Sequence, residues 1–170
     1  DALNEEQQFF RKRARPKILL ATCYDDAVGL YRRYGSNLLG VISDIGFVLH
    51  RNDSPSLEKL DAGVDLCHLI REEMPKMPIL MQSSQESMKA VAVSLKAGFL
   101  MKRSKTLTHE LSEYIGKEFG FGDFVVTDHR GREIARAHDL NGAEKIISTL
   151  TEKDLESLKD KNYVSRWLLA

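Results

Sequence analysis

Three residues whose side chains can handle a phosphoryl group follow short apolar runs of the sequence. They are Asp44, Ser83 and Lys102. Apolar runs of this length are typical of buried strands in a parallel sheet, and such sheets carry their sites at the carboxyl ends of the strands. A carboxylate, a hydroxyl and an ammonium group at that edge could accept, orient and neutralise a phosphoryl group.

The elements that must position these residues form an alternation of apolar strands and amphipathic helices. We expect strands at residues 17–24, 38–43, 79–82 and 99–101, helices at 3–15, 27–34, 62–74, 85–97 and 106–119, and a loop at 47–61. Strands that alternate with helices of this length predict an α/β fold with a parallel sheet and right-handed crossovers.

The pattern changes at Gly120, which divides the chain into residues 1–119 and a small α+β extension or linker at 120–170. The extension is predicted to contain a β-hairpin around Gly131, a helix at 141–150 and a last helix. Thr151 and Asp154 have the spacing of a capping box, with Asp in place of Glu or Gln. We interpret the hairpin as either an appended lobe or a homodimer surface.

Composition excludes several classes of function. The 170 residues include 25 basic and 25 acidic side chains, so no nucleic-acid or membrane surface is indicated. The basic cluster at 11–15 is interpreted as a solvated helix end. Cys23 and Cys67 lie in apolar contexts and are expected to be reduced core residues of a cytoplasmic protein. The five histidines show no spacing typical of metal ligands.

The region from about 17 to 119 resembles a response-regulator receiver domain of two-component signalling. The residues that carry the resemblance are Val41–Asp44, Pro78–Ser84 and Ala97–Lys102, which appear in the family's order. The resemblance implies a flavodoxin-like sheet flanked by helices, and a phosphorelay in which a histidine kinase or a small phosphodonor phosphorylates Asp44. It also implies that Mg²⁺ is bound by Asp44 and the carbonyl of Gly46.

The same resemblance gives roles to the other two residues. Ser83, or Ser84 as the alternative, would turn its hydroxyl towards the phosphoryl oxygens. Lys102 would pair with them, and Arg103 or Lys105 could replace it if the register slips. These residues would make the segment a phosphoprotein, with no enzymatic activity beyond its own phosphorylation and dephosphorylation.

Asp25 and Asp26 are similar to the acid pair that binds metal in receivers, but only one helix fits between them and Asp44. Residues 17–24 therefore match the second strand of a receiver, and Asp25 and Asp26 are predicted to cap the next helix. On this interpretation the family's first strand, with the acid pair that Mg²⁺ needs, lies upstream of residue 1.

The whole chain is also similar to the N-terminal region of bacterial proteins related to phosphoenolpyruvate synthase and pyruvate phosphate dikinase. The stretches that carry this likeness are 15–21, 37–44, 82–84 and 119–124. It implies that the receiver-like module regulates an attached ATP-dependent phosphotransferase.

Two departures from the receiver pattern leave a second hypothesis open. No proline follows Asp44 closely, and Arg103 rather than proline follows Lys102. The alternative is a pseudo-receiver that is not phosphorylated and serves as a docking or dimerisation module.

Overall fold

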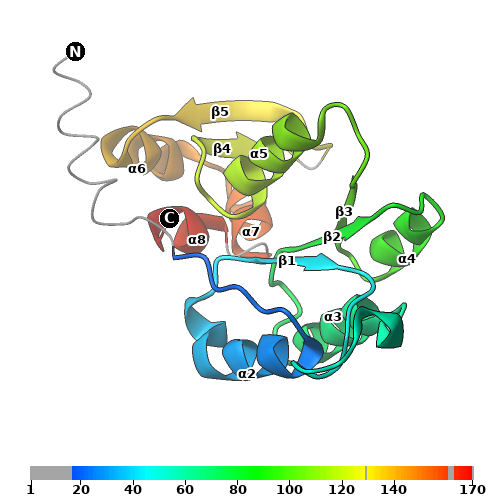
Figure 1. Cartoon of the computed structure of the whole chain (residues 1–170). Coiled ribbons are helices and arrows are strands. Elements are labelled where there is room, and N and C mark those ends of the chain that lie inside the picture. Colours follow the sequence, from blue (N-terminus) through cyan, green and yellow to red (C-terminus); the bar gives the residue numbers. More distant parts are fainter. Residues whose placement is uncertain (1–16, 129, 161–162, 170) are drawn as a thin grey trace, which may run out of the picture.

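The computed structural model describes residues 17–128, 130–160 and 163–169 (Figure 1). The helix expected at 3–15 lies outside these residues. The strands are β1 (Val41–Asp44), β2 (Ile79–Ser83), β3 (Gly98–Met101), β4 (Phe124–Thr127) and β5 (Glu133–Ala137). The α-helices are α2 (Tyr24–Tyr34), α3 (Ala62–Glu73), α4 (Met88–Ser94), α5 (Leu107–Glu118), α6 (Leu140–Thr149), α7 (Glu152–Asp160) and α8 (Tyr163–Leu169), with short 3₁₀ turns η1 (Gly35–Asn37) and η2 (Pro55–Leu57).

The first unit is built on a three-stranded parallel sheet in the order β1-β2-β3. Figure 1 shows α2 and α3 below this sheet and α5 above it. The prediction of an α/β fold with a parallel sheet flanked by helices is therefore confirmed at this level. The strands predicted around Asp44, Ser83 and Lys102 form the sheet, each close to its predicted bounds.

The central strand β2 explains why these apolar runs form strands. Because successive side chains of a strand point to opposite faces, Ile79 and Met81 pack into the core formed with α2 and α3. Leu80 lies on the other face, where the ring of Tyr114 in α5 approaches the sheet and its hydroxyl donates a hydrogen bond to the carbonyl of Ile79 at 2.8 Å. A strand segment that is buried on both faces must be apolar, as Ile79, Leu80 and Met81 of β2 are.

The strand expected at 17–24 is wrong, because residues 17–22 have no strand assignment and α2 already begins at Tyr24. Ile18 and Leu20 are 91% and 81% exposed. A strand needs a neighbour to satisfy its backbone groups, and none of the described strands lies beside this segment. Its apolar composition alone therefore does not make it part of the sheet.

The predicted capping of α2 by Asp25 or Asp26 is also wrong. The N-cap is Cys23, and no side chain caps this helix end. Both aspartates lie in the first turn, where negative charge suits the helix dipole. Their carboxylates instead pair with His50 and Arg51, at 2.7 and 3.0 Å. The two acids thus connect α2 with the loop that follows β1.

The C-terminal unit has a core of its own, formed by buried residues of the hairpin and of the helices that follow it. β4 and β5 pair antiparallel, with an irregularity between Val126 and Thr127. Gly131 has a φ of +77°, as the glycine turn requires. One half of the capping box is present, because the Asp154 N–H donates to the Thr151 hydroxyl at 3.4 Å; the Asp154 carboxylate accepts from that same hydroxyl at 2.6 Å. The single last helix that we expected is two helices, α7 and α8.

Candidate phosphoacceptor site

The structure places Asp44 and Lys102 in direct contact at the carboxyl edge of the parallel sheet. The Lys102 Nζ lies 2.9 Å from Asp44 Oδ2, although β2 separates the strands that end at these residues. Both side chains remain partly open to solvent, with exposed fractions of 39% and 46%. An ammonium held beside a carboxylate at an open edge can neutralise the charge of a group that is transferred to that carboxylate.

The backbone around this pair is fixed by three hydrogen bonds, which join it to the end of β2 and the beginning of α3. The Ile45 N–H donates to the Gln82 carbonyl at 3.1 Å, and the Lys102 N–H donates to the Ser83 carbonyl at 3.0 Å. These bonds extend the sheet one residue beyond each strand. On the α3 side, the Gly63 N–H donates to the Ile45 carbonyl at 2.8 Å.

Gly63 allows this close approach because it has no Cβ. A Cβ built on Gly63 would lie 2.1 Å from the carbonyl oxygen of Asp44. The beginning of α3 is therefore packed against the end of β1 through backbone atoms. The sequence signal for this contact is a glycine inside the first turn of a predicted helix.

A shallow cavity of about 360 Å³ opens directly over the pair. Its lining residues come from the ends of β1 and β3 and from the loop after β1: Asp44, Gly46, Phe47, Val48, Asp53, Pro55, Glu58 and Lys102. The loop is folded back by mutual backbone hydrogen bonds between Phe47 and Lys59 at 3.2 and 3.1 Å. Sequence reasoning missed Asp53 and Glu58, because only this folding brings them to the cavity.

Ser83 lies at the same edge of the sheet but does not line the cavity. It pairs with Met101 across β2 and β3, one residue before Lys102. Its hydroxyl accepts a hydrogen bond from the Gln85 N–H at 3.0 Å. To reach a group on Asp44, this hydroxyl would have to leave Gln85. The alternative residue Ser84 is exposed.

The loop over the cavity is anchored to α2 by charged pairs. His50 Nδ1 contacts Asp25 at 2.7 Å, and the Arg51 guanidinium contacts both oxygens of Asp26 at 3.0 and 3.1 Å. The hydrogen bond from Arg51 lowers the pKa of Asp26, and the hydrogen bond to Asp25 raises the pKa of His50. Both acids are therefore engaged with the loop and not with Asp44.

Two of the groups expected to hold Mg²⁺ lie at this cavity. Mg²⁺ takes oxygen ligands in octahedral geometry, and here Asp44 could supply a carboxylate and Gly46 a carbonyl. However, no three acidic, histidine or cysteine side chains in the described part of the chain are arranged to hold a metal ion. The Lys102 ammonium already lies against Asp44, and its charge opposes the approach of a cation.

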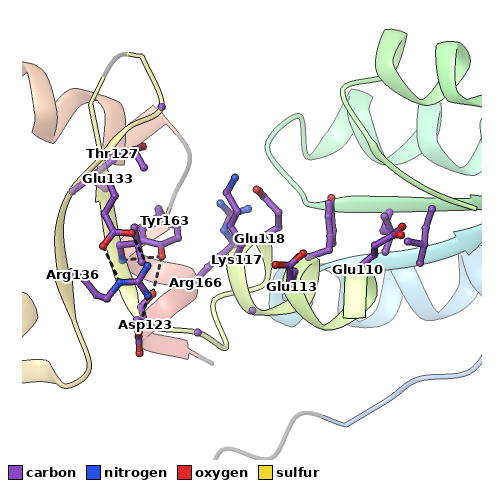
Figure 2. Close-up of a pocket in the computed structure, with 18 of the residues that line it drawn as sticks. Glu110, Glu113, Lys117, Glu118, Asp123, Thr127, Glu133, Arg136, Tyr163 and Arg166 are labelled. Carbon is purple, nitrogen blue, oxygen red and sulfur yellow. Dashed lines mark hydrogen bonds and ion pairs between the residues drawn. The ribbon is translucent and has the colours of Figure 1, made fainter. Parts of the chain in front are cut away.

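A second and larger cavity, of about 850 Å³, lies between α5 and the C-terminal unit (Figure 2). On its hairpin side Arg136 contacts Asp123 at 2.8 Å and Glu133 at 2.6 Å. His138 and Arg136 lower the pKa of Asp123, and the two acids raise the pKa of Arg136. These charged groups are thus paired with one another at the hairpin side of the cavity.

Comparisons with known proteins identify no family for this chain, so the assignment of this site rests on its geometry. No protein-family model, curated protein or solved structure matches the chain. Among the described helices none is both long and apolar enough to cross a lipid bilayer.

Proposed function

We propose that this chain is a receiver-like phosphorelay module that accepts a phosphoryl group on Asp44. The observation that supports it is the contact of 2.9 Å between Lys102 Nζ and Asp44 Oδ2 at the carboxyl edge of three parallel strands. The proposed fold is the flavodoxin-like receiver fold, with its first strand outside the described residues. The proposed setting is the cytoplasm, with a histidine kinase or a small phosphodonor as the donor.

The chemistry needs only a few steps from the chain's own residues. A carboxylate oxygen of Asp44 attacks the phosphorus of the donor and forms a new P–O bond, while the bond from phosphorus to the donor's leaving group breaks. Lys102 neutralises the oxygens of the transferred group. Ser83 is the residue proposed to rotate towards these oxygens, after its hydroxyl releases the Gln85 N–H.

The metal requirement of the family belongs to the same proposal. In the proposed site an acid pair from a preceding strand would hold Mg²⁺ together with the Asp44 carboxylate and the Gly46 carbonyl, and the metal would supply positive charge next to the transferred group. The proposed output is regulation of an attached enzyme similar to phosphoenolpyruvate synthase or pyruvate phosphate dikinase.

The test is phosphorylation of a polypeptide that includes the proposed preceding strand, with acetyl phosphate and Mg²⁺, followed by intact-mass measurement. We expect one added phosphoryl group, and none in Asp44→Asn. Asp53→Asn is the matched control, because Asp53 lines the same cavity but has no proposed role. A product that persists in Asp44→Asn, or disappears only in Asp53→Asn, refutes the assignment.

The alternative function is a docking or dimerisation module without phosphorylation. The observation that favours it is the exposed outer edge of β1, where Ile42 is 42% exposed. If Asp44 takes no phosphoryl group under the conditions above, this alternative replaces the first proposal.

A further inference from the structure

The loop that follows β1 brings the carboxylate of Glu58 to the cavity over Asp44. This carboxylate packs against Gly46, two residues after Asp44, and occupies the space that a Cβ on Gly46 would need. The glycine therefore leaves room for a second carboxylate at the carboxyl end of β1.

The backbone on both sides of Glu58 is anchored, which fixes the direction from which its side chain enters the cavity. The Glu58 N–H donates to the Pro55 carbonyl at 3.2 Å, at the end of the 3₁₀ turn η2. The next residue, Lys59, exchanges two backbone hydrogen bonds with Phe47. The position of Glu58 thus depends on the fold of the loop and not on a contact of its own carboxylate.

The carboxylate oxygens of Glu58 remain available. Within the described part of the chain no hydrogen bond or ion pair engages them. The adjacent ammonium of Lys59 pairs instead with Asp65 at the beginning of α3. Asp53, the other acid of this loop that lines the cavity, differs, because its carboxylate accepts a hydrogen bond from the His50 N–H at 2.9 Å.

We propose that Glu58 is the general base that hydrolyses the phosphorylated form of Asp44, an inference that rests on the proposed function. Glu58 takes a proton from a water molecule, whose oxygen attacks the phosphorus and forms a new P–O bond. The bond between phosphorus and the Asp44 oxygen breaks, and its electron pair returns to the Asp44 carboxylate. Inorganic phosphate leaves, and Glu58 releases the proton to solvent.

The cavity has room for this reaction. Its volume is about 360 Å³, whereas a water molecule needs only about 10–15 Å³ of such space. A positioned general base contributes on the order of 10²–10⁴-fold to a rate. Glu58 would therefore set how long the phosphoryl group stays on Asp44, and with it the duration of the signal.

Decay of the phosphorylated protein tests this role. The polypeptide that includes the proposed preceding strand is phosphorylated with acetyl phosphate and Mg²⁺, the donor is removed, and the loss of the phosphoryl group is followed by intact-mass measurement. Glu58→Gln keeps the size of the side chain and is expected to slow the decay about tenfold or more. Asp53→Asn removes one negative charge from the same cavity and is expected to decay at the wild-type rate.

Addition of formate separates the proposed chemistry from a structural role. Formate can supply a carboxylate to the space that Glu58→Ala empties, so it is expected to accelerate the decay of this variant and not that of the wild type. A wild type that takes no phosphoryl group refutes the proposed function and this inference with it. With a phosphorylated wild type, three results overturn this inference alone: decay of Glu58→Gln at the wild-type rate, equal slowing in Asp53→Asn, or no effect of formate on Glu58→Ala.

Discussion

Gly63→Ala is the substitution that most directly tests how the backbone holds Asp44. The added Cβ would lie 2.1 Å from the carbonyl oxygen of Asp44 and 3.0 Å from the Cα of Ile45. Real Cβ atoms essentially never approach closer than 3.0 Å, so the first contact must open by 3.0 − 2.1 = 0.9 Å. Both obstructing atoms belong to the backbone, so a side-chain rotation cannot relieve the contact.

The expected cost follows from two opposing effects. Overpacking that moves the backbone costs about 1–3 kcal/mol, and the replacement of a helical glycine by alanine returns about 0.5–1 kcal/mol. We therefore expect Gly63→Ala to lower the free energy of unfolding by up to about 2.5 kcal/mol. The end of β1 should also shift, which would separate Asp44 from Lys102.

Gly29→Ala is the matched control, because Gly29 lies in α2 with nothing within 4 Å of its Cβ position. It is expected to raise the free energy of unfolding by about 0.5–1 kcal/mol. Urea denaturation of the wild type and both variants gives these values. If Gly63→Ala is as stable as Gly29→Ala, the close packing of α3 on β1 is wrong, and with it our account of how Asp44 is positioned.

Three further predictions concern other parts of the chain. Arg71→Ala should lower the free energy of unfolding by about 1.5–3 kcal/mol in urea denaturation, because the guanidinium donates to four backbone carbonyls beyond the ends of α3 and α4. Tyr114→Phe should lower it by about 1 kcal/mol, because a carbonyl of β2 loses its bond from the hydroxyl; an unchanged urea midpoint contradicts this. His138 and Arg136 lower the pKa of Asp123, so its stabilisation is present above the ordinary pKa of about 4 and disappears as the pH falls through the lowered value; the stability difference from Asp123→Asn, measured across acidic pH, should shrink accordingly.

The part of the fold that the sequence predicts well is the part decided by local pattern. The runs that end at Asp44, Ser83 and Lys102 are mainly apolar, and all three form strands of the parallel sheet. Because parallel strands bring their carboxyl ends to one edge, the meeting of Asp44 and Lys102 follows from the order of the elements. The position of the Ser83 hydroxyl does not follow, because a local turn with Gln85 decides it.

The wrong predictions concern features that depend on interactions between segments far apart in the sequence. Residues 17–22 have strand composition, but a strand exists only when a partner satisfies its backbone, and composition does not say whether one is present. Asp25 and Asp26 have the residue type and position of helix caps. Their carboxylates contact His50 and Arg51, 25 positions away in the chain. Because these contacts depend on how the loop after β1 folds, the local sequence around the two aspartates does not predict them.

Stability and chemistry rest on different atoms at this site. The contact between Asp44 and Lys102 joins two half-exposed side chains, and exposed ion pairs contribute only about 0.2–1 kcal/mol. The end of β1 is instead held by backbone hydrogen bonds to β2 and α3, which no side-chain replacement at Asp44 or Lys102 removes. Both positions can therefore be changed with little effect on the fold, which means that a loss of phosphorylation in such variants reports on the chemistry itself.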